Sequence, residues 1–156
     1  MVRVGTAREL EAAVRTEAAR ADVVVMAAAV ADFRPLTVAG VKLKKDAGAP
    51  VVQLEPNPDV LAGLLADPPR EGQVVVGFAA ETGDAEGDWL AHGRAKLARK
   101  PCDLIVVNRV GADLGFESPD NAAVVLASDG SQTVVPHGPK TALADVVWDL
   151  VVARLA

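Results

Sequence analysis

The pattern of hydrophobic and polar positions changes several times along the chain. Short Val-rich runs are typical of strands buried in a sheet, whereas apolar residues spaced three or four apart are typical of amphipathic helices. The short runs predict buried strands at 22–27, 74–79 and 104–107. The wider spacing predicts helices at 7–20, 58–65, 85–100 and 140–155.

Local signals mark the starts of two of these helices. Thr6, with Glu9 three residues later, forms the pattern of a capping box for the first helix. Asn57 is expected to cap the second helix, with Pro58 at the first helical position, where the missing N–H costs no hydrogen bond. Residues 2–4, which precede the capping box, are interpreted as the tail of a strand.

Two segments are expected to form hairpins. The sequence Ser-Asp-Gly at 128–130 joins the apolar runs 122–127 and 133–135, which predicts an antiparallel pair at one edge of the sheet. Farther towards the N-terminus, a Pro- and Gly-containing stretch holds the short runs 41–44 and 51–54. These two runs are short enough to pair as a flap.

Strands that alternate with helices predict the fold class. We expect an α/β domain with a Rossmann-like, mostly parallel sheet, helices on both faces, an antiparallel edge hairpin and a protruding flap. The 156 residues suit a single domain, here taken as 1–156, with a proper hydrophobic core. Hydrophobic residues make up 51% of the chain and charged residues 24%, which is typical of a globular protein.

Charge and composition exclude several classes of function. The net charge of −5 and the 3% aromatic content argue against nucleic acid as a partner. No apolar run approaches the roughly 18 residues of a membrane span, and the N-terminus has no apolar signal core, so no membrane partner is expected. The single cysteine, Cys102, excludes an internal disulfide and suits a reducing, cytoplasmic setting.

The most informative stretch runs from Asp22 to Lys45. Its strand ends in four small residues, Ala27, Ala28, Ala29 and Ala31, and the carboxylate of Asp32 follows. In an open parallel sheet, ligands bind outside the carboxyl ends of the strands, and small residues there let a ring or a phosphate approach the main chain. An acid next to a basic loop predicts a site for a nucleotide.

Each of these charged residues also has a simpler interpretation. Asp32 is equally well explained as a loop acid or a helix cap. The lysine cluster of 42, 44 and 45 is by default a solvated loop, although its alternation places Lys42 and Lys44 on one face of an extended segment. Lys96 and Lys100 are four residues apart on one helix face, and simple exposure is the interpretation that the spacing favours.

The remaining candidates give no catalytic set. Phe78 is most simply a core residue, although its place before small residues also suits a ring packed against a ligand. His92 and His137 lie apart, with no second ligand at metal-binding spacing, so a metal site stays unknown. The chain contains no nucleophile elbow, Walker A loop or glycine fingerprint for dinucleotides.

Taken in order, seven segments resemble a known family. They are AAAVADFRP, VKLKK, NPDVL, VVGFAAET, AKLARK, DLIVVN and SPDNAAVVL, and together they cover essentially the whole chain. The sequence resembles bacterial phosphopantothenate–cysteine ligase, the CTP-dependent synthetase of coenzyme A biosynthesis. That synthetase is usually fused behind a flavin-dependent decarboxylase, and FMN belongs to the fused half only. The family's domain also begins with a Gly-rich strand–helix unit that has no counterpart in this chain.

The resemblance implies a set of site residues. It gives Lys42 a catalytic role in supporting the acyl-nucleotide intermediate, and it leaves Asn121 without an assigned role. The residues that it places around CTP are Met26, Ala27, Ala28, Asp32, Lys42, Pro58, Asp59, Val60, Leu61, Phe78, Lys96 and Lys100. The resemblance places Lys96 and Lys100 at the triphosphate, which reverses their interpretation as merely exposed side chains.

The resemblance also implies the reaction and the partners. The carboxylate of 4′-phosphopantothenate would attack the α-phosphate of CTP, with Mg²⁺ present, and the amine of cysteine would then displace CMP. The family works as a homodimer, which makes the flap at 38–45 the candidate for partner contact. Three alternatives stay open: a CTP-binding subdomain without unaided catalysis, a generic Rossmann-like oxidoreductase domain, and a non-enzymatic assembly module.

Overall fold

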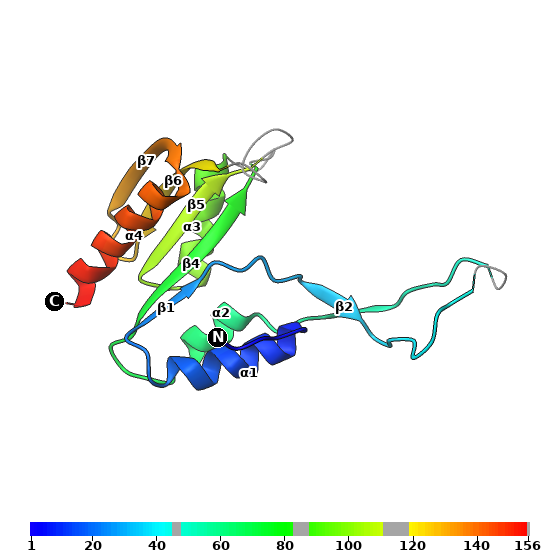
Figure 1. Ribbon diagram of the computed structural model, residues 1–156. Helices are drawn as coiled ribbons and strands as arrows, with labels where there is room; N and C mark the ends of the chain where they lie inside the picture. The colour runs from blue at the N-terminus through cyan, green and yellow to red at the C-terminus, as the bar shows by residue number, and fades with distance from the viewer. Residues whose placement is uncertain (45–47, 83–87, 111–118, 156) are drawn as a thin grey trace.

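The computed structural model describes residues 1–44, 48–82, 88–110 and 119–155. Lys45, the predicted helix start at 85–87 and residues 111–118 lie outside these ranges. The described elements follow the predicted alternation of strands and helices (Figure 1). In chain order they are α1 (Ala7–Ala18), β1 (Val23–Met26), β2 (Phe33–Pro35), β3 (Leu54–Pro56), α2 (Val60–Ala66), β4 (Val74–Glu81), α3 (Trp89–Arg99), β5 (Leu104–Arg109), β6 (Asp120–Ala127), β7 (Gln132–Pro139) and α4 (Lys140–Leu155).

The main sheet has five strands in the order β1-β4-β5-β6-β7. The pairs β1–β4 and β4–β5 are parallel, whereas β5–β6 and β6–β7 are antiparallel. Because two antiparallel steps restore the original direction, β7 runs the same way as β1, β4 and β5. Four of the five strands therefore point one way, which confirms the mostly parallel sheet and its antiparallel edge hairpin.

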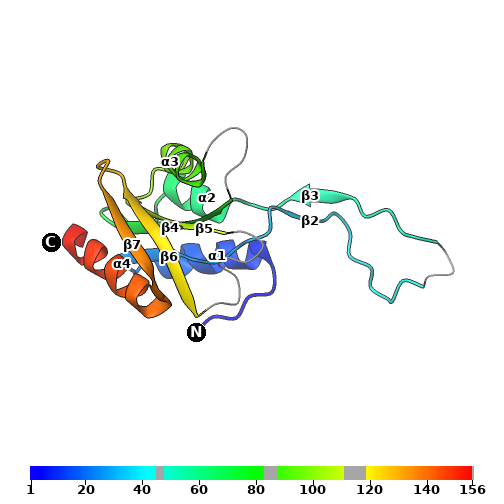
Figure 2. The same cartoon turned by 90° about the horizontal axis from the view of Figure 1, so that it is seen from above.

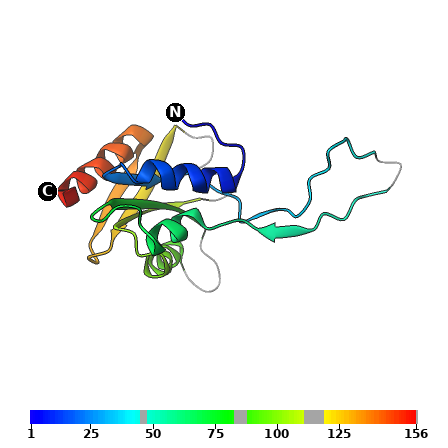
Figure 3. The same ribbon diagram turned by 90° about the horizontal axis from the view of Figure 1, so that it is seen from below.

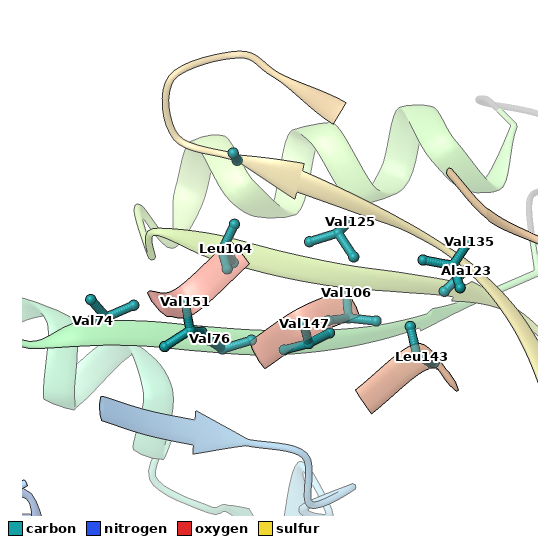
Figure 4. Close-up of a cluster of buried hydrophobic side chains, with 11 residues drawn as sticks. Val74, Val76, Leu104, Val106, Ala123, Val125, Val135, Leu143, Val147 and Val151 are labelled. Atoms are coloured by element: carbon teal, nitrogen blue, oxygen red, sulfur yellow. The ribbon is translucent and has the colours of Figure 1, made fainter. Parts of the chain in front are cut away.

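Helices cover both faces of the sheet. On one face, α4 packs Leu143, Val147 and Val151 against alternate strand residues such as Val76 and Val106 (Figure 4). On the other face, α1, α2 and α3 pack against the intervening residues, and this second cluster includes Cys102. The alternation follows from the period of two in a strand, which sends neighbouring side chains to opposite faces. The prediction of helices on both faces is confirmed.

Several predicted elements are also confirmed in detail. Thr6 Oγ1 accepts a hydrogen bond from the Glu9 amide at 3.2 Å, and the Glu9 carboxylate accepts one from the Thr6 amide, which completes the capping box. In the turn between β6 and β7, Gly130 has a φ of 85°, a left-handed conformation that glycine adopts without strain. The hairpin strands are longer than predicted, because β6 begins at Asp120 and β7 ends at Pro139.

Three sequence-based expectations about the strands are wrong. Residues 2–4 form no strand and pair with none of the described strands. The predicted buried strand 22–27 is instead an edge strand, β1, in which Val25 is 40% exposed. An uninterrupted apolar run cannot distinguish an edge from a central strand when the ordering of the sheet is unknown.

The third correction concerns the flap, which pairs through other residues than predicted. The two-stranded ladder joins β2 to β3, with Arg34 opposite Glu55, and 41–44 forms no strand. Beyond this ladder the chain extends away from the main sheet in all three views (Figures 1–3). We call residues 33–44 and 48–56 the arm. The protruding flap that the sequence predicted is therefore present, with its pairing closer to the sheet.

Candidate functional site

A cavity of about 780 Å³ opens at the carboxyl ends of the parallel strands. Its walls come from the loop after β1, the start of α2, the ends of β4 and β5, and parts of α3 and α4. This is the edge of the sheet at which open α/β folds bind their ligands. The cavity brings together eleven of the twelve residues predicted to bind nucleotide: Met26, Ala27, Ala28, Asp32, Pro58, Asp59, Val60, Leu61, Phe78, Lys96 and Lys100.

Hydrogen bonds from Asn57 fix the loop after β1. The Asn57 amide N–H donates to the Asp32 carbonyl at 2.7 Å, and its side-chain Nδ2 donates to the Ala31 carbonyl at 2.8 Å. Arg34 in turn donates to Asn57 Oδ1 at 3.1 Å and pairs with Glu55 at 2.8 Å. These hydrogen bonds join the loop after β1 to the base of the arm. They fix the position of the loop, which forms one wall of the cavity.

This arrangement corrects the predicted cap of α2. Asn57 is engaged with the loop, and the cap is Asp59, whose Oδ1 accepts a hydrogen bond from the Ala62 amide at 3.0 Å. Pro58 lies before the helix and not at its first position. Both Asn and Asp are good caps, so sequence preference alone could not decide between them.

Asp59 also holds one of the two cavity lysines. Its Oδ2 lies 2.6 Å from Lys100 Nζ, and the lysine side chain is only 25% exposed. Burial opposes ionisation of Asp59, but the hydrogen bonds from Lys100 and Ala62 and the nearby charges of Lys100 and Lys96 outweigh it. Together they hold the pKa of the Asp59 carboxyl below its ordinary value. Asp59 is therefore ionised at neutral pH and joins α2 to α3 across the cavity wall.

Lys96 is held in the same way by Glu81, the last residue of β4. Lys96 Nζ lies 3.2 Å from Glu81 Oε1, and the two side chains are 29% and 21% exposed. The interpretation of Lys96 and Lys100 as merely exposed side chains is therefore wrong, because both are half-buried and paired. The error arose because helix spacing shows which residues share a face but not what that face packs against.

The packing of α3 explains how lysines late in the helix reach the strand ends. A helix that connects two parallel strands runs antiparallel to them, so α3 begins at the cavity end, where Asp88 caps it. Side chains on a helix lean towards its N-terminus. Lys96 thus points back towards the cavity, and Leu90 and Leu97 anchor the helix in the core beneath. Lys100 directly follows the helix as its C-cap residue, and its ion pair with Asp59 directs its side chain to the cavity wall.

The cavity has a second polar wall that the sequence did not reveal. Asn108 at the end of β5, Asn121 at the start of β6 and Lys140 at the start of α4 all line it, together with Trp148. The place of Asn108 at a parallel strand end was a usable signal. The place of Lys140 in the cavity wall could not be predicted from the sequence, because it depends on where β7 ends.

Lys42 is the one predicted nucleotide-binding residue that does not line the cavity. It lies on the arm, where its side chain is exposed, and the arm extends away from the sheet (Figure 1). Within a single copy of the chain, the structure therefore does not bring Lys42 to the other predicted residues.

Two further properties concern the described residues alone. No group of three or more His, Cys, Asp or Glu side chains among them gathers closely enough to hold a metal ion. None of their helices combines the length and the apolarity that crossing a membrane requires.

The fold and the cavity define a Rossmann-like α/β domain with a ligand site at the ends of its parallel strands. The sequence matches the family described as "DNA/pantothenate metabolism flavoprotein C-terminal domain" over residues 1–155, and the chain belongs to that family. It is 51% identical to the coenzyme A biosynthesis bifunctional protein CoaBC of Mycobacterium tuberculosis, over 100% of this chain and 38% of the relative. The chain thus spans about two fifths of that relative's length.

Solved structures agree with this assignment. A crystal structure of the C-terminal domain of a CoaBC protein superposes with a TM-score of 0.72 at 28% identity, over 99% of this chain and 67% of that one. A Cab2 mutant in complex with phosphopantothenate-cysteine superposes with a TM-score of 0.70 at 16% identity, over 98% of this chain and 52% of that one. The second likeness bears on the fold alone.

The double role of Asp59 gives a prediction for stability. Asp59→Ala removes the α2 cap and should lower the free energy of unfolding by about 1 kcal/mol, whereas Asp59→Asn keeps a capping oxygen and should cost only a few tenths. Because the folded-state pKa of Asp59 is lowered, its contribution is fully present above the unfolded pKa of about 3.9 and is lost as the pH falls further.

Urea denaturation at pH 7 and at pH 3 measures both effects. At pH 7 the two variants should differ, and at pH 3 the difference between wild type and Asp59→Asn should shrink. Equal losses for Ala and Asn at pH 7 would show that the charge of Asp59, and not its cap, stabilises the fold.

Proposed function

We propose that this chain is the CTP-binding part of a ligase that joins 4′-phosphopantothenate to cysteine in coenzyme A biosynthesis. The observation that carries the proposal is the cavity at the strand ends, into which Lys96 and Lys100 are directed by half-buried ion pairs. Membership in the family supports it, as does the name of the relative in Mycobacterium tuberculosis. The Cab2 complex was solved with phosphopantothenate-cysteine, which is the product of such a reaction.

The proposed reaction has two steps. A carboxylate oxygen of 4′-phosphopantothenate attacks the α-phosphorus of CTP, and the bond to pyrophosphate breaks to leave an acyl-cytidylate. The amine of cysteine then attacks the acyl carbon, the bond to CMP breaks, and the amine loses a proton. Neither step uses a protein nucleophile. The task of the chain is therefore to bind, orient and stabilise charge.

In this proposal Lys96 and Lys100 bind the triphosphate. A polyphosphate is more highly charged than a single carboxylate, so it can replace Glu81 and Asp59 as the partner of these lysines. Each lysine keeps a charged partner with and without ligand, and its side chain stays near the same place. Electrostatic groups fixed in advance stabilise a transition state at little reorganisation cost.

The cytidine moiety would bind at the end of β1. Exposed main chain at Met26–Ala28 offers N–H and C=O groups to the edge of cytosine, and Phe78 offers an apolar ring. The Asp32 carboxylate lies just beyond and can accept hydrogen bonds from the ribose. Selection of CTP over ATP would depend on these contacts.

Magnesium would arrive with the nucleotide. Mg²⁺ usually keeps several waters and is bound through one or two carboxylates together with substrate phosphates. Asp32 and Asp59 are carboxylates on the cavity wall, which fits such a shared ion. When bound, the ion would neutralise charge that develops on the phosphates.

The arm supports a homodimer in this proposal. The arm carries a series of exposed apolar side chains, and such a patch is typical of a surface that binds another protein. These side chains belong to Phe33, Leu36, Val38, Val41, Leu43, Val51, Val52 and Leu54. Because Lys42 lies on the same arm, away from the cavity of its own chain, its predicted catalytic role would require it to reach the cavity of a second copy.

The dimer is tested by light scattering after gel filtration. The wild-type chain should run as a dimer, and Val38→Asp with Val41→Asp should run as a monomer, because both side chains are highly exposed at 86% and 79%. Val134→Asp is the matched control, since Val134 is 67% exposed on β7 and not on the arm. Dimers that survive the arm substitutions would contradict this role.

A measurement of turnover separates the proposal from its alternatives. Release of CMP that depends on both 4′-phosphopantothenate and cysteine would support the complete ligase reaction. CTP binding without CMP release would support a nucleotide-binding subdomain, which we favour for the isolated chain. Binding of NADP would favour an oxidoreductase, and no nucleotide effect would favour an assembly module.

A further inference from the structure

Arg34 lies at the base of the arm, beside the cavity but not in its wall. Among the described residues that line the cavity, Asn57 is present and Arg34 is not. The Arg34 guanidinium donates to the Pro56 carbonyl at 2.6 Å and to Asn57 Oδ1 at 3.1 Å, and it pairs with Glu55 Oε1 at 2.8 Å. Only 21% of the Arg34 side chain is exposed, so these contacts are partly sheltered from water.

The contact between Arg34 and Asn57 determines which way the Asn57 amide faces. An arginine side chain carries donors only, so the atom that Asn57 turns towards it must be the oxygen. The nitrogen Nδ2 then points the other way, where it donates to the Ala31 carbonyl at 2.8 Å. The Asn57 main-chain N–H donates to the next carbonyl, that of Asp32, at 2.7 Å. Arg34 and the loop carbonyls thus fix the amide from both ends.

This chain of hydrogen bonds ends at the part of the cavity where the nucleoside would bind. Ala31 and Asp32 line the cavity, and so do residues 26–28 at the end of β1. The lysines proposed to bind the triphosphate, Lys96 and Lys100, come from the α3 side and are held there by ion pairs of their own. Arg34 therefore acts on one half of the proposed nucleotide site and not on the other.

We propose that Arg34 is a positioning residue for the nucleoside part of the nucleotide. Through the Asn57 amide it holds the loop after β1 in the conformation that receives the base and the ribose, and it does so without touching the ligand. A loop that is ordered before binding loses less conformational entropy when the ligand arrives, which raises the affinity. This inference rests on the proposed function, in which the cytidine moiety binds at the end of β1.

Calorimetric titration with two probes separates the nucleoside part from the phosphates. CTP would contact both halves of the site, whereas inorganic tripolyphosphate, titrated under the same conditions with Mg²⁺, carries phosphates alone. Wild type should bind CTP more tightly than tripolyphosphate. Arg34→Met keeps an unbranched side chain but removes every donor. It should bind CTP about tenfold more weakly, because the loop must then be ordered on binding, while its affinity for tripolyphosphate stays unchanged. A general loss of structure would lower both affinities alike.

Further variants test the route through Asn57. Glu55→Gln keeps an oxygen that accepts from Arg34 and leaves the Asn57 contact in place, so it should bind CTP like wild type. Asn57→Leu removes the hydrogen bond to the Ala31 carbonyl without adding charge, so it should show the same selective loss of CTP affinity. Adding Arg34→Met to it should cause little further loss, because both changes break the same chain of bonds. Where Arg34→Met does not fold, Arg34→Lys replaces it, because one ammonium group lacks the planar fork that reaches several acceptors.

The outcomes separate this inference from the proposed function. If Arg34→Met keeps the preference of wild type for CTP over tripolyphosphate, or loses affinity for both probes equally, Arg34 does not position the nucleoside part. An equal loss in Glu55→Gln would assign the effect to the ion pair of the arm and would overturn the inference as well. If wild type binds CTP no more tightly than tripolyphosphate, the nucleoside contributes nothing to binding and the proposed function fails first.

Discussion

Replacing Lys100 with alanine should lower the affinity of the chain for CTP about tenfold or more. Hydrogen bonds to charged groups contribute roughly 1.5–3 kcal/mol each, which corresponds to about 10- to 150-fold in affinity. Lys100 is preorganised for such a contact, because Asp59 holds its Nζ at 2.6 Å and only 25% of its side chain is exposed. The loss should be smaller at high salt, where the charges are screened.

The fold should tolerate this change. The carboxylate left behind on Asp59 has a side chain that is 50% exposed, so water can solvate it, and exposed ion pairs contribute little to stability. Arg94→Ala is the matched control, because Arg94 lies on the same helix and bonds to Gln132 at 3.2 Å, outside the cavity. Unchanged CTP affinity in Lys100→Ala, or an equal loss of affinity in Arg94→Ala, would show that Lys100 does not bind the nucleotide.

The second large effect is expected at Gly93, where α3 packs closely on β5. A methyl group at Gly93 would lie 2.6 Å from Cγ2 and 2.8 Å from Cγ1 of Val107, a side chain with no exposed surface. Overpacking of this kind costs typically 1–3 kcal/mol, and here it should exceed the gain of about 1 kcal/mol that alanine brings to a helix. We expect Gly93→Ala to lower the free energy of unfolding by about 1–2 kcal/mol on balance.

A double-mutant cycle checks this prediction. Val107→Ala removes the two methyl groups that meet the added carbon, so Gly93→Ala should be less harmful in that background. Since Gly93 lies one turn before Lys96, outward movement of α3 should also weaken CTP binding. If Gly93→Ala instead stabilises the chain by the gain of about 1 kcal/mol expected for alanine over glycine in a helix, the prediction is wrong. The contact with Val107 would then not limit the position of α3.

Much of the fold could be predicted because local patterns decide it. The capping box at Thr6 and the hairpin turn at 128–130 depend on residues close in sequence, and the structure contains both. The rule that ligands bind at the ends of parallel strands placed Ala27 and Asp32 at the cavity. The resemblance added Lys96 and Lys100, whose spacing alone favoured simple exposure.

The remaining features depend on contacts between distant segments. The apolar run of β1 did not show that it is an edge strand, because only the order of the sheet decides this. Asn57 and Asp59 are both good caps, and the choice between them depends on the loop after β1, which Asn57 binds. Lys140 reaches the cavity only through the β7–α4 junction, a geometry with no local signature.

Calorimetric titration measures directly whether the cavity residues bind CTP. The chain is titrated with CTP in the presence of Mg²⁺, with ATP and NADP under the same conditions as controls. We expect saturable binding of CTP, weaker binding of ATP and none of NADP, with the CTP signal reduced in Lys100→Ala. Absence of CTP binding, or NADP binding as tight as that of CTP, would contradict a CTP site in this cavity.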